Sequence, residues 1–121
     1  MNVDEEADLI EITVKNHVKK QLTDCKVYME YPKGDAPDYF LVLDRTEGGR
    51  EDHIVTGTFV ANSYGPSKLG AAMLHEKVKR AMDSLYSLPR IAGCDLIGDY
   101  PFFDTQHNRY RYQAVYEITY Y

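Results

Sequence analysis

Apolar residues near the start of the chain recur at steps of three and four, which is the spacing of one stripe on a helix. Acidic side chains crowd the start of this segment and lysines its end, so both groups complement the helix dipole. We therefore predict an amphipathic helix from Asp4 to about Leu22. Its apolar positions are Val3, Ala7, Ile10, Val14 and Val18, and its charged ends are Asp4, Glu5 and Glu6, then Lys15, Lys19 and Lys20.

A second apolar stripe predicts another helix in the middle of the chain. Ser67 follows a glycine and a proline and is a suitable N-cap, whereas Pro89 ends the helical pattern. The segment between Ser67 and Pro89 is therefore predicted to be an amphipathic helix whose apolar face covers a sheet. The stripe consists of Ala71, Leu74, Val78, Ala81, Met82 and Leu85.

Five further segments have the composition of strands. The unbroken apolar run 39–43 is typical of a strand covered on both faces, although periodicity alone leaves a buried helix open. Segment 46–52 has the glycines and polarity of a hairpin connection, after which 53–64 is predicted as a long strand with Val55, Gly57, Phe59 and Ala61 on one face. The other predicted strands are 25–30, 91–99 and 109–121, with 31–37 a loop and 100–108 a hairpin tip.

Strict alternation marks the last strand. Tyrosines and apolar residues occupy one face and mostly polar residues the other, so the strand should lie on the core with its first face. The predicted order is α-β-β-β-α-β-β, and the hairpin-length connections favour antiparallel pairing. We therefore predict one α+β domain over residues 1–121, with a single, mostly antiparallel sheet of about five strands and two helices packed on one face.

The charge and composition of the chain disfavour several classes of function. The net charge of −5 disfavours stable DNA binding, although an acidic wall would let DNA slide past without sticking. Cys25 and Cys94 are expected to be buried free thiols, because two distant cysteines make neither a metal motif nor a disulfide framework. An acidic start and the lack of a long apolar run predict a chain that stays in the cytoplasm where it is made, without membrane contact.

Motifs for chemistry are incomplete in this sequence. His75-Glu76 begins like a zinc-protease pattern, but Lys79 stands where the second histidine is needed. The glycines of segment 65–70 have phosphate-loop spacing without the lysine and hydroxyl that follow them. Segment 51–53, Glu-Asp-His, is better explained as a solvated loop than as a metal site. We predict no enzyme activity, no catalytic residue, no cofactor and no metal, while triads assembled from distant residues stay open.

Two other groups of residues have structural explanations. Asp99, Asp104, Arg109 and Arg111 flank one predicted hairpin, where cross-strand ion pairs explain them more simply than catalysis. The 11 tyrosines suit half-buried surfaces such as subunit contacts, although an aromatic strand face lying on the helices is an equal explanation. Stacking of single-stranded nucleic acid on tyrosine and arginine is a weaker alternative.

Leu69 and Met73 fall almost opposite the stripe of the second helix, where the cover of a monomer should be polar. Exposed apolar residues at that position favour a partner. We therefore predict that Leu69 and Met73 belong to a subunit interface.

Several segments resemble a family of short phage and prophage tail proteins, the tail terminators of long-tailed phages. The resemblance covers nearly the whole chain. The segments are 39–43 (YFLVL), 48–53 (GGREDH), 59–67 (FVANSYGPS), 104–105 (DT) and 109–116 (RYRYQAVY).

The resemblance implies a structural virion protein. Members of this family form a hexameric ring that caps the tail tube and offers the surface on which the filled head docks. It implies as partners a second copy of the chain, the tail tube protein, head-tail connector proteins and DNA in transient passage, with the protein at the head-proximal end of the virion tail. A projecting charged loop, Glu47, Arg50, Glu51, Asp52 and His53, would serve in docking. A neck, head-completion or minor capsid protein is the alternative.

Overall fold

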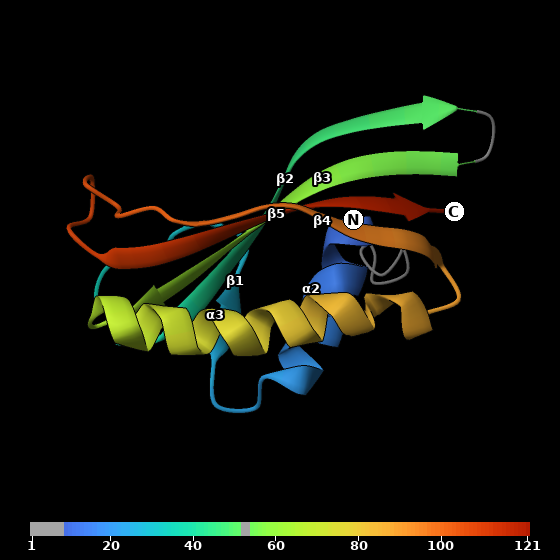
Figure 1. The fold of residues 1–121 in the computed structure, drawn as a ribbon. Helices are drawn as coiled ribbons and strands as arrows, with labels where there is room; N and C mark the ends of the chain where they lie inside the picture. Colours follow the sequence, from blue (N-terminus) through green and yellow to red (C-terminus); the bar gives the residue numbers. More distant parts are fainter. Residues whose placement is uncertain (1–8, 52–53) are drawn as a thin grey trace.

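The computed structural model describes residues 9–51 and 54–121, which form two α-helices, a short 3₁₀ helix and one five-stranded sheet (Figure 1). This composition and order confirm the predicted α+β fold. The elements are α2 (Ile10–Gln21), β1 (Lys26–Tyr28), β2 (Phe40–Glu51), β3 (Ile54–Gly65), α3 (Lys68–Asp83), η1 (Ser84–Ser87), β4 (Ile91–Pro101) and β5 (Tyr110–Tyr120).

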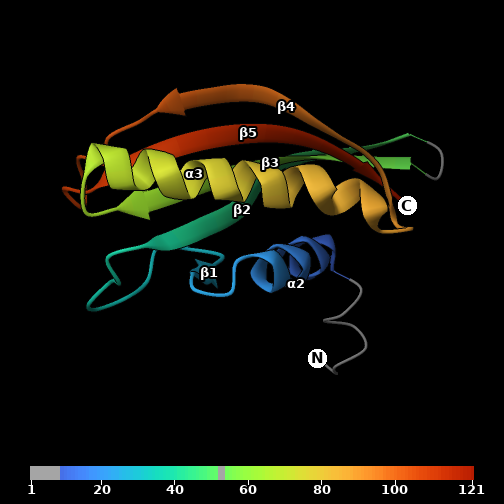
Figure 2. The same cartoon turned by 60° about the horizontal axis from the view of Figure 1, so that its bottom comes forward.

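The strands are arranged in the order β1-β2-β3-β5-β4, so β1 and β4 form the two edges of the sheet. Only β1 and β2 pair in parallel, and the three other pairings are antiparallel. Both helices lie on the same face of the sheet, with α2 beside the β1 edge and β4 at the far side (Figure 2). The predicted sheet type and helix placement are therefore correct.

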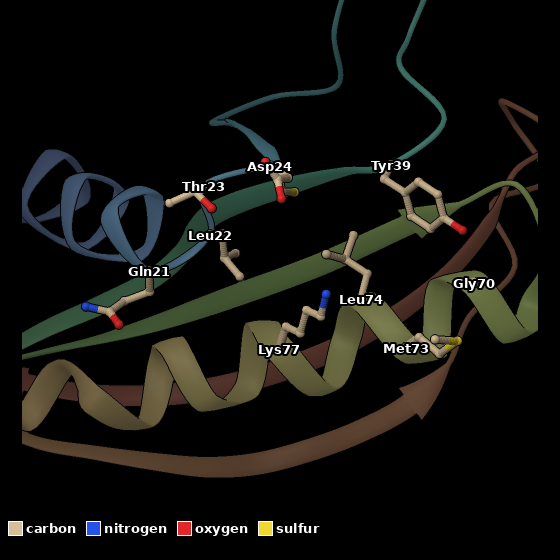
Figure 3. Close-up of a pocket in the computed structure, with 10 residues that line it drawn as sticks. Gln21, Leu22, Thr23, Asp24, Tyr39, Gly70, Met73, Leu74 and Lys77 are labelled. Carbon is tan, nitrogen blue, oxygen red and sulfur yellow. The ribbon is translucent and has the colours of Figure 1, made fainter.

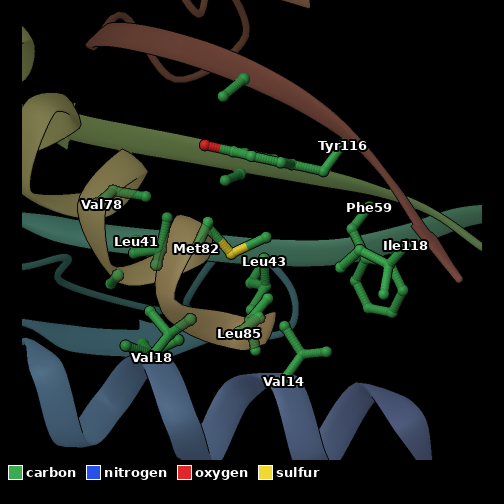
Figure 4. Close-up of a cluster of buried hydrophobic side chains, with 14 of the residues drawn as sticks. Val14, Val18, Leu41, Leu43, Phe59, Val78, Met82, Leu85, Tyr116 and Ile118 are labelled. Carbon is green, nitrogen blue, oxygen red and sulfur yellow. The ribbon is translucent and has the colours of Figure 1, made fainter. Parts of the chain in front are cut away.

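The main core lies between the two helices and the covered face of the sheet (Figure 4). Val14 and Val18 of α2 and Val78 of α3 are fully buried, as the helical spacing predicts. β5 contributes Tyr116 and Ile118 from its aromatic face, which confirms the predicted alternation. The tyrosines of this strand face therefore serve the core in part, since Tyr116 and Tyr120 are buried, whereas Tyr110 is exposed.

A smaller apolar cluster occupies the opposite face of the sheet. Phe40, Val42 and Tyr64 are buried there beneath the loop that contains Tyr31, and the rings of Phe40 and Tyr64 are stacked with centroids 4.5 Å apart. Leu41 and Leu43 belong instead to the main core, on the face of the sheet that the helices cover. The prediction that this run is a strand covered on both faces is therefore confirmed.

The predicted hairpin connection at 46–52 is wrong. Strand β2 continues through Glu51, and its outer half pairs residue by residue with β3 from Glu47↔Thr58 to Glu51↔Ile54. A bulge between Arg45 and Glu47 absorbs the change of register. Ladder hydrogen bonds thus outweigh the turn preference of the two glycines at 48 and 49.

Helix α3 begins where the sequence predicts. Ser67 has extended backbone angles, and its hydroxyl accepts a hydrogen bond from the amide of Gly70 at 3.0 Å. The predicted end before Pro89 is also correct, because the last turn tightens into η1. The start of the first predicted helix, before residue 9, lies outside the described residues.

Candidate functional site

Leu69 and Met73 lie on the outer face of α3. Their side chains are 71% and 61% exposed, whereas Ala71, Leu74 and Val78 face the core. The sequence therefore placed both residues on the correct face of the helix. Their role in a subunit contact stays a prediction.

Met73 also lines a groove of about 340 Å³ where the end of α2 approaches α3 (Figure 3). Tyr39 packs so closely on α3 that a Cβ at Gly70 would come within 2.9 Å of the Tyr39 hydroxyl oxygen, so the Tyr39 ring would have to shift to make room for it. We call Tyr39, Leu69 and Met73 the groove surface. The residues that line the groove are Gln21, Leu22, Thr23, Asp24, Cys25, Tyr39, Gly70, Met73, Leu74 and Lys77.

A second apolar surface follows the opposite edge of the sheet. β4 is an edge strand, and five large apolar or aromatic side chains are exposed within residues 96–103. The unpaired backbone groups of an edge strand can bind another chain, and β4 exposes these apolar side chains although it also carries Asp95, Asp99 and Pro101. Sequence reasoning missed this surface, although two adjacent apolar pairs were a visible signal. We call it the β4 surface: Leu96, Ile97, Tyr100, Phe102 and Phe103.

The hairpin tip that carries Phe102 and Phe103 is fixed by Asp104. This carboxylate is buried and accepts hydrogen bonds from the Tyr64 hydroxyl at 2.7 Å and from the His107 ring at 2.8 Å. Burial alone would raise the pKa of Asp104, but these hydrogen bonds outweigh it and hold the pKa below its usual value. The carboxylate is therefore ionised at neutral pH.

Arg111 connects Asp104 to the β4 surface. Its guanidinium lies 3.8 Å from the Asp104 carboxylate, donates from Nε to the Phe102 carbonyl at 2.7 Å and covers the Phe102 ring at 4.2 Å. Tyr31 stacks on the His107 ring at 3.5 Å, which ties the 29–38 loop to the same tip. These contacts hold Phe102 in a defined position at the end of the edge strand.

The predicted ion pairs of this hairpin are correct for Asp104 and Arg111 only. Arg109 donates to the carbonyls of Pro37 and Asp38 instead. Asp99 turns away from both arginines and bonds to Lys79 at 2.7 Å. Sequence proximity could not separate these outcomes, because Lys79 reaches Asp99 from a different element.

Ser63, His75 and Asp99 form a hydrogen-bonded chain across three elements, in which Ser63 and His75 are buried and Asp99 lies at the surface. His75 Nδ1 lies 2.8 Å from the Ser63 hydroxyl, and its Nε2 lies 2.9 Å from the Asp99 carboxylate. Burial lowers the pKa of His75, and Asp99 offsets only part of this effect, so the ring is neutral at neutral pH. A carboxylate can only accept, so Nε2 carries the proton and Ser63 donates to Nδ1.

This chain has the composition of a catalytic triad, but its geometry is structural. Ser63 is completely buried, so its hydroxyl meets no substrate in this conformation. Its members instead join β3, α3 and β4, and Lys79 closes the chain on the Asp99 side. The network therefore fixes the edge strand β4 against the helix. Sequence reasoning left triads of distant residues open and had no signal for this one.

Acid is expected to destabilise the fold through His75. Because its folded pKa lies below the unfolded value of 6.5, the unfolded chain binds more protons below that pH, and stability falls as the pH drops further. One such proton costs at most about 1.4 kcal/mol per pH unit. Urea unfolding at pH 7.5 and 5.5 should show a larger loss for the wild type than for His75→Gln.

The comparison between these two proteins isolates His75. His17 is half-buried, and desolvation and the neighbouring Lys20 lower its pKa, so it weakens the fold in acid in the same direction, but it is present in both proteins. Asp99 and Asp104 have pKa values below 3.8 and stay ionised over this range. Equal losses for the two proteins would contradict the assignment.

The predicted docking loop is a pair of projecting strands. Glu47, Arg50 and Glu51 are exposed on the outer half of β2, which extends beyond its pairing with β1 while β3 stays paired with β5 on its other side (Figure 1). Asp52 and His53 lie outside the described residues. At the base of the projection, Arg45 contacts Glu11 of α2 and the Tyr120 hydroxyl. The charged segment is therefore placed on a supported ribbon.

Cysteine chemistry is unfavourable in this fold. Cys25 and Cys94 are free and half-buried, and burial raises their pKa values to about 11 and about 12. Among residues 9–51 and 54–121, no three His, Cys, Asp or Glu side chains are placed to hold a metal ion. Within the same ranges, no helix has the length and apolar character needed to cross a membrane.

No protein-family model matches this chain, and no curated protein matches it either. The surfaces and contacts of the molecule itself are therefore what points to its function.

Proposed function

We propose that this protein is a structural assembly subunit of a phage tail, which forms a ring that caps the tail tube and provides a surface for head docking. One observation carries the proposal: the subunit has two different exposed apolar surfaces, one on α3 and one along the edge strand β4. The groove surface lies beside α2, and the β4 surface lies along the far edge of the sheet (Figure 2).

Two different surfaces suit head-to-tail association. A two-fold dimer uses one self-complementary patch, whereas a cyclic ring requires each subunit to offer two patches that fit one another. Both surfaces stand on rigid elements, since α3 packs on the sheet and β4 is tied to it through Asp99. Repeated contacts of this kind close into a ring when the rotation between neighbours is suitable.

The projecting charged strands supply a third surface. Glu47, Arg50 and Glu51 are exposed well away from the groove and from β4, so they stay accessible in a ring made through those two surfaces. Charged projections favour docking, because complementary fields steer encounter and fix register. The net charge of −5 is compatible with DNA passing the ring without being retained.

Light scattering over a concentration series tests the proposal. The subunit mass is 13.9 kDa, and we expect a mass near six subunits or a monomer–hexamer equilibrium at neutral pH. A monomer at every concentration would contradict a self-assembling ring and favour a monomeric neck adaptor. Retention on DNA that falls steeply with salt would instead favour a nucleic-acid-binding module.

Charged substitutions on the groove surface should weaken association. The double variant Leu69→Glu, Met73→Glu places carboxylates where apolar contact is proposed, and we expect at least a tenfold higher dissociation constant. The fold should be unaffected, because both side chains are exposed. Sedimentation velocity measures the association and circular dichroism the fold.

Tyr86→Glu is the matched control. Tyr86 is 76% exposed in η1 and belongs to neither surface, so this variant adds one carboxylate at a similarly exposed apolar site outside the proposed contact. Association of the double variant at the wild-type level would remove the groove surface from the interface.

A further inference from the structure

The groove side of the subunit is basic. Helix α2 carries Lys15, Lys19 and Lys20 against the single acid Glu11. Glu11 is already paired with Arg45 at 3.4 Å, whereas the three lysines make no ion pair with any described residue. Lys77 adds a further cation on the wall of the groove, which also contains the carboxylate of Asp24. Helix α2 and the groove wall together thus carry four lysines and two acids, so the net charge of this side is positive.

The β4 side is acidic. The strand contains Asp95 and Asp99 and no basic residue. Asp99 is neutralised by Lys79, but Asp95 is exposed and makes no ion pair with the described part of the chain. Asp83 lies close by, because Asp83 and Asp95 both add to the burial that raises the pKa of Cys94. Negative charge therefore lies beside Leu96 and Ile97.

We infer that the occupant of the groove surface is the β4 edge of a second copy of this chain, with Asp95 placed toward the lysines of α2. This inference rests on the proposed ring and names the two surfaces that meet in it. Apolar residues face apolar residues, and opposite charges border them. The reverse pairing, β4 against β4, brings Asp95 and Asp83 of the two copies together and is disfavoured by repulsion.

The pairing is heterologous, which gives a complementation test. The groove variant Leu69→Glu, Met73→Glu keeps its β4 surface, and the β4 variant Asp95→Lys, Ile97→Lys keeps its groove. Each variant alone should be monomeric. An equimolar mixture has one intact contact, so it should form a dimer of twice 13.9 kDa and nothing larger.

The outcomes separate the interface from the proposed function. A groove variant that dimerises alone would show β4–β4 pairing and overturn the inference. A wild-type protein that assembles while both variants assemble equally well would also overturn it, but would leave the ring intact. A wild-type protein that stays monomeric, with no dimer in the mixture, would contradict the ring and the pairing together.

Charge reversal tests the electrostatic part directly. Asp95→Lys alone should weaken association at least tenfold, and adding Lys19→Glu and Lys20→Glu to the same chain should restore most of it. Glu51→Lys is the control, because Glu51 is exposed at the outer end of β2 and belongs to neither surface of the proposed contact. Failure of the added glutamates to restore any association would remove the lysines of α2 from the interface.

Discussion

Replacing Gly65 by alanine is expected to destabilise the fold by about 3 kcal/mol, at the upper end of the usual cost of overpacking. A Cβ built on Gly65 would lie 2.5 Å from the amide nitrogen of Ala71 and 2.9 Å from its Cα. These are backbone atoms of the first turn of α3, and the same amide is bonded to the Ser67 carbonyl at 2.9 Å. No flexible side chain can move aside, so β3 and α3 must separate.

Urea unfolding followed by circular dichroism measures this loss, and Gly49→Ala is the matched control. Gly49 also lies in a strand, but its added Cβ would meet nothing within 4 Å. That substitution should change stability by less than about 0.5 kcal/mol. Similar stabilities for the two variants would show that α3 can shift away from β3 at little cost.

Periodicity made the fold predictable. The two helical stripes and the alternation of the last strand each identify a buried face, and one buried face per element is enough to place two helices on one sheet. Segment 39–43 was predicted to be a strand covered on both faces because its apolar run is unbroken. The structure adds what covers the second face, namely the loop that contains Tyr31.

Turn chemistry was the weaker signal. Gly48 and Gly49 favour a turn locally, but pairing with β3 continues across both as far as Glu51↔Ile54. The short strand β1 is shorter than predicted, because only three of the six residues in the predicted strand 25–30 pair with β2. Local preference decides a boundary only where no neighbouring strand competes.

The polar networks were beyond sequence reasoning. Ser63 and His75 are 12 positions apart and Asp99 is 24 further on, so no local motif connects them. Asp104 likewise accepts a hydrogen bond from Tyr64, which lies 40 positions earlier in the chain, in β3. The exposure of Leu69 and Met73 was predictable, because helical spacing alone places both residues opposite the apolar stripe of α3. The β4 surface depends on which strand forms the edge, which topology decides.

Both networks support the β4 surface. The chain through His75 fixes the middle of β4 to α3, and the contacts of Asp104 and Arg111 fix the tip that carries Phe102. A surface held in one conformation loses little entropy on association. Polar contacts that face away from the partner can therefore contribute to assembly without touching it.

Removing the carboxylate at 104 is the sharpest test of this support. Asp104→Ala leaves the Tyr64 hydroxyl and the His107 ring without their acceptor and the Arg111 guanidinium without its counter-ion. Asp104 is only 5% exposed, so water replaces it poorly. We expect a loss of about 3 kcal/mol at pH 7, the cost of breaking a buried charged network. Asp95→Ala, at an exposed acid without an ion pair, should change stability by less than about 0.5 kcal/mol.

The pH dependence of the Asp104→Ala loss has a definite sign. The folded pKa of Asp104 lies below 3.8, so its stabilisation is complete above that pH and declines as the pH falls toward the folded value. Hydrogen exchange should also quicken at the Asp104 and Arg109 amides, which bond across the tip at 2.9 and 3.1 Å, while the amide of buried Phe59 is affected less. Weaker association would follow, because the tip carries Phe102 and Phe103. Unchanged exchange at the tip would show that Asp104 does not position the β4 surface.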